Sequence, residues 1–322
     1  MRVTYKYSNK FVGNEKEVGS GIHTAIREGI IKSRADLWIT SKLWGTYHSA
    51  AHVPMALKRT LEDIDTDYLD LYLVSSAKDD GKTIHFTENR CKLIISCRLS
   101  VLFLAQIHWP IALKFVEFER LYPPSWTHPD NPLRIQFARV SFQETWRGME
   151  DLVSRGHVRN IGLSNVLTAS VWDILCHANI MPSVLQTERH VYNQQENLLR
   201  FCKNHNIATT AYSPLGASGY VDIGLARQQD SSLNEPIIKE LATKYKITPA
   251  QVLLIWNLQT GGTIISKSSV PARLAENIGI CNLNVVLTTD DLAQIKTLEK
   301  RLFFNDPAKF MPPLGGFVPL FD

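Results

Sequence analysis

The feature that most constrains the fold of this chain is a regular alternation of two kinds of segment. Stretches with an apolar residue every three or four positions, typical of amphipathic helices, alternate with short apolar runs typical of buried strands. Short connections join them, so the pattern predicts an α/β fold with parallel strands and crossover helices. The expected helices are 14–30, 53–64, 142–156, 167–178, 195–205, 236–246 and 248–259, and the expected strands are 36–42, 68–73, 158–165, 183–189, 207–213 and 262–268.

Polar side chains follow strand after strand in this pattern. An open doubly wound sheet and a closed (β/α) barrel both fit the alternation, but no GxGxxG fingerprint follows a first strand. In a barrel these polar positions would converge on the carboxyl-terminal mouth, where barrel active sites lie. We therefore expect residues 1–322 to form a single barrel domain. The polar positions are Lys42, His108, Ser164, Asn165, Gln186, Glu188, Tyr212, Ser213, Lys267 and Ser268.

Residues 74–106 interrupt the alternation between a strand and an Ile-His-Trp-Pro sequence. Their most hydrophobic part, 93–106, contains Arg98 and is shorter than the ~20 apolar residues that span a bilayer. A membrane anchor is therefore not expected here.

Composition excludes several other classes of protein. The net charge is +4 for 322 residues, and no dense Lys/Arg run suggests a surface for nucleic acid. No apolar N-terminal stretch resembles a signal peptide, and no cysteine spacing suggests a metal site or a disulfide framework. We expect a cytoplasmic monomer or homodimer that acts on a small molecule. The five cysteines are scattered at Cys91, Cys97, Cys176, Cys202 and Cys281.

Seven motifs occur in an order that resembles the aldo-keto reductases: ITSKLW, IHWP, IGLSN, LQTE, AYSPLG, ISKSSVPARLAEN and FNDP. Two further stretches, IALKFVEFERLYPP and RLFFNDP, look most like fungal xylose reductases. The resemblance runs from Gly13 to the C-terminus, apart from residues 74–106. It implies a (β/α)8 barrel, here incomplete at its N-terminus, because no first strand and first helix are recognisable. It also implies hydride transfer from NADPH, or NADH, to the carbonyl of an aldose such as xylose or another small aldehyde.

The resemblance assigns roles residue by residue. Lys42 and His108 would be the catalytic lysine and histidine, and Trp109 and Asn305 would join His108 in contacting the substrate. The nicotinamide would be held by Ser164, Asn165, Gln186 and Tyr212. Ser213, Leu215 and Gly216 would bind the pyrophosphate through backbone N–H groups. The adenosine end would be bound by Lys267, Ser268, Ser269, Arg273, Glu276 and Asn277.

Two members of the family's catalytic tetrad are missing. The family tyrosine stands immediately before Gly-Asn-Glu, where this chain has Val12, and the aspartate stands five residues earlier, where it has Tyr7. Loss of a general acid costs ~10²–10⁴ in rate, so the chain is expected to be a poor catalyst. Two alternatives stay open: a catalytically dead NADPH-binding pseudoenzyme, and the product of a faulty gene model.

The interruption has alternatives of its own. Removing residues 74–106 joins Leu73 to Ile107 and restores one strand that ends in histidine. Val74-Ser75 can be encoded by GTAAGT and Gln106 by CAG, the sequences expected at the ends of an intron, so a translated intron is the leading hypothesis. A genuine loop is the other, in which residues 100–106 would replace the strand before them and pair with 38–42. Transcript reads that join Leu73 to Ile107 would support the intron.

Overall fold

A computed structural model of the chain describes residues 15–70, 106–107, 110–221, 224–266, 268 and 270–321. Five parallel strands form the central sheet of this part, and an antiparallel pair lies in a long connection. The helices are α1 Glu15–Arg27, α2 Val53–Ile64, α3 Phe142–Ser154, α4 Thr168–His177, α5 Glu196–Asn204, α6 Ser218–Val221, α7 Pro236–Tyr245, α8 Pro249–Gly261, α9 Pro271–Gly279, α10 Thr289–Lys296 and α11 Pro307–Phe310. The strands are β1 Gln106–Ile107, β2 Thr127–His128, β3 Asn131–Ile135, β4 Gly162–Ser164, β5 Val184–Glu188, β6 Ala208–Tyr212 and β7 Thr263–Ile265.

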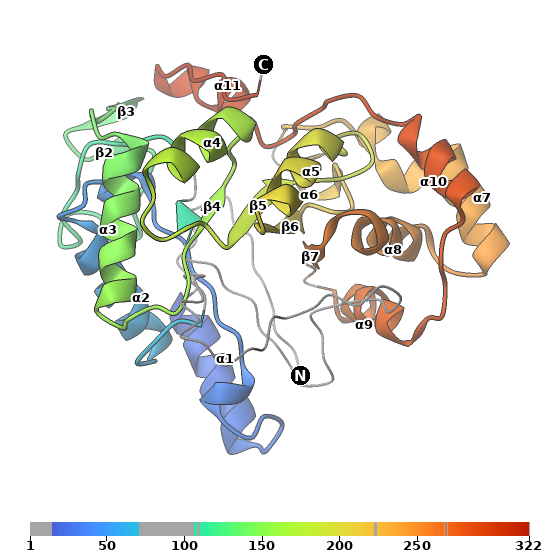
Figure 1. The fold of residues 1–322 in the computed structure, drawn as a ribbon, viewed down its shortest axis with the longest axis horizontal. Coiled ribbons are helices and arrows are strands. Elements are labelled where there is room, and N and C mark those ends of the chain that lie inside the picture. The colour runs from blue at the N-terminus through green and yellow to red at the C-terminus, as the bar shows by residue number, and fades with distance from the viewer. Residues whose placement is uncertain are drawn as a thin grey trace.

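The central sheet has the order β1-β4-β5-β6-β7, and each neighbouring pair is parallel. Helices α1, α2 and α3 lie on one side of these strands, and α7, α8 and α9 lie on the other (Figure 1). Sequential strands are spatial neighbours and helices make the crossovers, as expected for a β/α repeat. Because all the strands run in one direction, their carboxyl ends gather at one end of the sheet.

All seven expected helices are confirmed, most with bounds within two residues of the prediction. Their ends carry the local signals that fix helix starts. The Ser141 hydroxyl accepts the backbone N–H of Glu144 at 3.0 Å, and Thr248 with Gln251 forms a capping box at α8. Four of the expected strands become β4, β5, β6 and β7. The strand prediction at 36–42 is wrong within the described residues, because Thr40 makes an isolated bridge where a strand requires consecutive pairings.

The middle strand β5 explains why the expected strands read as apolar runs. All five of its residues are buried, since β4 and β6 flank it and helices cover the sheet. Large apolar side chains fill the space around it, among them Trp146, Met149 and Leu163. The polar residues Ser164, Gln186 and Glu188 in β4 and β5 are buried too, whereas Tyr212 at the end of β6 is half-buried.

The Asp70 side chain joins the 68–70 segment to two other parts of the chain. Its carboxylate receives the Arg34 guanidinium at 2.6 Å and the Arg159 guanidinium at 2.8 Å, and its side chain is 3% exposed. The two guanidinium groups also lie over the ring of Tyr68, at 4.2 and 4.4 Å from its centroid. One buried carboxylate thus holds the start of this segment against the segment that leads into β4.

The register of the sheet continues across the interruption. Leu69 bridges Val158 in parallel, and Ile107 pairs with Leu163, also in parallel. The partners are five residues apart (163 − 158), whereas Leu69 and Ile107 are 38 apart (107 − 69). The surplus is therefore 33 residues (38 − 5), which equals the length of 74–106. Both pieces occupy one strand position next to β4.

This pairing argues against replacement of the strand by residues 100–106. In the register set by Gln106 and Gly162, Leu102 would have to pair with Val158, but Leu69 holds that place. The expected pairing of 100–105 with 38–42 lies outside the described residues. The described pairings fit an insertion between two parts of one strand.

Deleting residues 74–106 should leave a 289-residue chain (322 − 33) with the same strand register. Because closing a 33-residue loop costs entropy that a continuous strand avoids, we expect the deletion to raise the free energy of unfolding by roughly 2 kcal/mol. Urea unfolding of both chains measures the difference. A shorter chain that is insoluble or less stable would contradict the shared strand.

Asp70→Asn should lower the free energy of unfolding by about 2–3 kcal/mol, because it leaves the partly buried Arg34 guanidinium, as well as the exposed one of Arg159, without a carboxylate. Asp151→Asn is the matched control, since it removes an exposed ion pair with Arg155. That control should cost less than about 1 kcal/mol. Equal costs for the two variants in urea unfolding would show that Asp70 is not a structural tie.

Candidate functional site

The polar residues predicted at the strand ends meet at the carboxyl end of the sheet. Ser164 pairs in register with Gln186, and Glu188 pairs with Tyr212 on the next strand. The Tyr212 hydroxyl donates to the Asn165 side-chain oxygen at 2.5 Å. The side chains of Ser164, Asn165, Gln186, Glu188 and Tyr212 therefore form one polar surface at the carboxyl end of the sheet.

Asn305 joins this surface from the C-terminal segment. Its side-chain amide donates to the Tyr212 hydroxyl at 3.3 Å. Asn165 has a positive φ of 56°, a backbone conformation that asparagine adopts more readily than most residues. Two amides thus lie on either side of one tyrosine hydroxyl.

Ser164 provides a test of whether a nicotinamide carboxamide fits here. Its hydroxyl oxygen is buried and has no hydrogen-bond partner in the described part of the chain. A buried hydroxyl without a partner is costly, and a carboxamide offers both the donor and the acceptor that it lacks. The neighbouring side chains of Asn165 and Gln186 add further amide groups. The residues present fit the group that the sequence predicted for them.

Lys42 reaches the same place from a different segment. Its Nζ lies 5.8 Å from the centroid of the Tyr212 ring, over the ring face. Burial lowers the pKa of Lys42 to about 8, because the charged ammonium is removed from water. Among the described residues no carboxylate pairs with it. The lysine therefore carries an uncompensated charge at neutral pH.

Glu15, the last residue of the Gly-Asn-Glu sequence, contacts the segment next to this lysine. The Ser41 hydroxyl donates to the Glu15 carboxylate at 2.5 Å, and the Thr60 hydroxyl donates to it at 3.2 Å. Burial raises the pKa of Glu15. Because Ser41 precedes Lys42, this contact brings the start of α1 close to the lysine. Val12 and Tyr7, which stand where the family has its tyrosine and aspartate, lie outside the described residues.

The predicted pyrophosphate segment has a backbone conformation that lets a phosphate approach closely. Ser213 and Gly216 have positive φ values of 52° and 70°. A Cβ added to Gly216 would lie 2.8 Å from the Ser232 hydroxyl oxygen, so a larger residue does not fit there. Ser232 in turn donates to the Leu215 carbonyl at 2.9 Å. The contacts of Ser232 with Leu215 and Gly216 thus help to fix the backbone of this segment.

The predicted adenosine end lies around the start of α9. Ser268 is buried and its hydroxyl accepts the backbone N–H of Val270 at 3.0 Å. Arg273 is exposed on the first turn of the helix, Glu276 is half-buried, and Asn277 is buried. An exposed arginine near a helix N-terminus suits a phosphate group. His108, Trp109, Lys267 and Ser269 lie outside the described residues.

An aromatic group that includes Trp44 was given no role from the sequence. The rings of Trp44 and Trp126 meet edge-on at 4.9 Å, and the Trp126 and Phe310 ring centroids are 5.4 Å apart. The only signal in the sequence was that Trp44 belongs to the ITSKLW motif, two residues after Lys42. Trp126 precedes β2 and Phe310 ends the short helix α11, so periodicity gave no sign of them. Glu188 was also noted only as a polar strand end.

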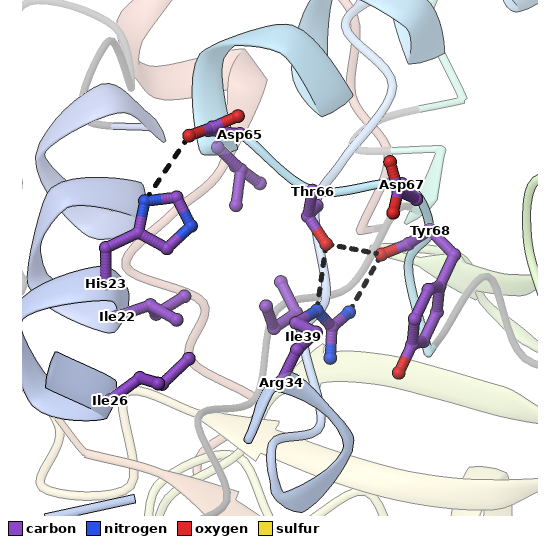
Figure 2. Close-up of a pocket in the computed structure, with 10 residues that line it drawn as sticks. Ile22, His23, Ile26, Arg34, Ile39, Asp65, Thr66, Asp67 and Tyr68 are labelled. Atoms are coloured by element: carbon purple, nitrogen blue, oxygen red, sulfur yellow. Dashed lines mark hydrogen bonds and ion pairs between the residues drawn. The ribbon is translucent and has the colours of Figure 1, made fainter. Parts of the chain in front are cut away.

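A cavity of about 240 Å³ among the described residues lies elsewhere (Figure 2). It opens between α1 and the 64–68 segment, where Arg34 donates to Thr66 and to the Tyr68 carbonyl. Residues 65–68 precede Leu69 in its strand position, so the cavity lies toward the amino ends of the strands. It contains none of the predicted site residues.

No helix in the described part of the chain is long and apolar enough to cross a membrane. No group of three or more metal-ligating side chains was found within the same residues.

Comparison with known proteins gives the family of this chain. The Aldo/keto reductase family model matches residues 6–300. A probable NAD(P)H-dependent D-xylose reductase of Emericella nidulans is 36% identical over 307 residues, which cover 95% of this chain and 84% of the relative. The NAD(P)H-dependent D-xylose reductase of Scheffersomyces stipitis is 39% identical over 298 residues, covering 91% and 81%. The aldose reductase structure from Schistosoma japonicum superposes with a TM-score of 0.68 at 29% identity, covering 89% of this chain and 76% of that one.

The parallel sheet, its crossover helices and this likeness define the fold class as a (β/α)8 barrel, as the sequence predicted. The chain belongs to the aldo/keto reductase family.

The lowered pKa of Lys42 predicts a pH-dependent contribution to stability. The ordinary value is 10.5 and the folded value is about 8, so the unfolded chain binds more protons between these two pH values. The stability of the wild-type chain should therefore rise with pH across this interval. Lys42→Met removes the buried charge, so its melting temperature should exceed that of the wild type below pH 8 by an amount that shrinks toward pH 10. Thermal melts of both chains from pH 7 to 10 test this, and a constant difference would contradict it.

Proposed function

We propose that this chain binds NADPH, with NADH as a possible substitute, and acts as a slow reductase of small aldehydes such as xylose. The observation that carries the proposal is the buried, unpartnered Ser164 hydroxyl beside Asn165 and Tyr212. The printed names of the relatives, NAD(P)H-dependent D-xylose reductases, support the same cofactor and substrate class. Trp44, Trp126 and Asn305 offer aromatic faces and an amide that suit a hydroxylated substrate.

The reduced nicotinamide supplies a hydride when it is bound. The Ser164 hydroxyl and the amides of Asn165 and Gln186 would hold the carboxamide, and the Tyr212 ring would stack on the nicotinamide ring. Binding in this place would replace the present bond between the Tyr212 hydroxyl and Asn165. His108 would orient the substrate carbonyl, and Arg273 with Lys267 would bind the adenosine phosphate.

Proton transfer is the weak step of this proposal. A tyrosine in the family's place would have its pKa lowered by the lysine next to it. Here Val12 stands at that position, and Lys42 has no carboxylate partner among the described residues. The charge of Lys42 remains close to the reacting carbonyl and can stabilise negative charge that develops on its oxygen. Val12, at the position of the family tyrosine, cannot donate the proton.

The second candidate is an NADPH-binding protein without turnover. The absence of tyrosine from position 12 and of aspartate from position 7 favours it, while the cofactor residues are retained. A third possibility is a chain that does not fold because it derives from a faulty gene model. We also expect a cytoplasmic location and a monomeric or dimeric state.

One titration separates the three. NADPH is added to the purified 322-residue chain, and cofactor fluorescence, xylose-dependent oxidation and the thermal melt are recorded together. We expect a cooperative melt, saturable binding and slow turnover. Binding without any turnover selects the second candidate, and an insoluble chain without a cooperative melt selects the third.

Restoring the missing side chains should restore the rate. The double variant Tyr7→Asp, Val12→Tyr should raise turnover by about 10²–10⁴, the usual contribution of a positioned general acid. The matched control pairs Tyr7→Asp with Val12→Phe, which adds the ring without the hydroxyl, and should leave turnover low. Robust xylose reduction by the unmodified chain that Lys42→Met abolishes would overturn the proposed weakness of proton transfer.

A further inference from the structure

The Glu188 side chain joins the end of β5 to the C-terminal segment. Its carboxylate accepts the backbone N–H of Phe304 on Oε1 and the backbone N–H of Asn305 on Oε2, both at 2.8 Å. The side chain is fully buried. Two consecutive backbone donors from a segment 116 residues away therefore bind one carboxylate.

His190 completes the partners of this carboxylate. Its Nε2 lies 2.9 Å from Glu188 Oε1, and its Nδ1 is buried without a partner among the described residues. Since the carboxylate accepts, Nε2 carries the proton in this contact. A buried carboxylate is tolerated when several donors surround it, and here three do. All three contacts thus stabilise the Glu188 carboxylate.

Asn305 extends this contact to the nicotinamide side of the site. Its side-chain amide donates to the Tyr212 hydroxyl, which donates to Asn165. Both Asn165 and Tyr212 belong to the predicted nicotinamide residues. Glu188 fixes the backbone of Asn305, and this backbone position determines where the Asn305 side chain donates to Tyr212.

Phe304 makes a second connection to the cofactor half. Its buried ring stacks on Tyr220 with centroids 5.6 Å apart, and it lies 5.0 Å from the His190 ring. The Tyr220 hydroxyl is 2.8 Å from the Ser213 hydroxyl in the pyrophosphate segment. Two neighbouring residues therefore contact both the nicotinamide and the pyrophosphate residues.

We propose that Glu188 is a positioning residue that fixes Phe304 and Asn305 against the cofactor-binding residues, so that the order of the C-terminal segment and the affinity for NADPH are coupled. The coupling rests on the proposed function, because it requires that NADPH binds at Tyr212 and Ser213. The positioning itself rests on the contacts of Glu188 alone. Glu188 does not touch the reacting atoms.

Glu188→Gln tests the positioning with almost no change in shape. A carboxamide has one oxygen where the carboxylate has two, so one of the two backbone N–H groups faces an NH₂ group and loses its acceptor. The matched control is Glu150→Gln. Glu150, on α3 and outside the site, is another buried carboxylate; its Oε1 accepts two consecutive backbone N–H groups, those of Asn179 at 2.7 Å and Ile180 at 2.8 Å. Among the described residues its Oε2 accepts only the Asn179 side-chain amide at 3.3 Å, so a glutamine whose oxygen takes the place of Oε1 keeps both backbone bonds.

Glu150→Gln should lower the melting temperature by no more than Glu188→Gln does, and only Glu188→Gln should weaken cofactor binding. We expect its Kd for NADPH, measured by fluorescence titration, to rise about tenfold, within the usual range of coupling between sites. Hydrogen exchange of the peptide covering 303–310 should accelerate in this variant and not in Glu150→Gln. An unchanged Kd, or equal changes in the two variants, would overturn the proposal.

Two further measurements keep the test decisive. If Glu188→Gln does not fold, Asn305→Ala cuts the link to Tyr212 while the backbone contacts of Glu188 remain. It should also weaken NADPH binding, and an unchanged Kd in that variant would overturn the coupling. A wild-type chain that binds no NADPH overturns the proposed function, and the exchange rates of 303–310 still decide whether Glu188 fixes the segment.

Discussion

The parallel pairing of β4, β5 and β6 is the constraint on which the rest of the structure depends. In-register pairing places Ser164 beside Gln186 and Glu188 beside Tyr212. A shift of one residue would turn each of these side chains to the other face of its strand. Hydrogen bonds between strands therefore determine the chemistry of the site, because they decide which polar groups meet.

The site that results carries two electrostatic costs. The Ser164 hydroxyl has no partner among the described residues, and Lys42 has a charge that burial makes less favourable. Functional sites often keep such costs because a ligand relieves them. Glu188 shows the opposite arrangement, since its buried charge is surrounded by three donors. The contrast distinguishes two groups of the candidate site that lack partners among the described residues from a carboxylate whose partners join two parts of the chain.

Much of the fold could be read from the sequence, because amphipathic helices and buried strands leave periodic patterns. The helix at 53–64 was predicted with the bounds it has, and the polar ends of β4, β5 and β6 were predicted to meet. The segment 36–42 was not predicted correctly, since its apolar residues say nothing about whether a neighbour is available to pair. The contact of Glu188 with Phe304 and Asn305 left no pattern, because it joins a side chain to backbone groups that every sequence has. Trp126 and Phe310 were missed for a related reason, as they come together only through long connections.

The continuity of register around residues 74–106 says something about how this part of the barrel is held. Leu69 and Ile107 keep their places opposite Val158 and Leu163 although 38 residues of chain separate them. Parallel pairing holds both places, and the two guanidinium groups on Asp70 add to it on the Leu69 side. A polypeptide cut between these two points would yield two fragments, one carrying Arg34 and Asp70 and the other carrying Arg159. The ion pair of Asp70 with Arg159 would then lie in the interface between the fragments.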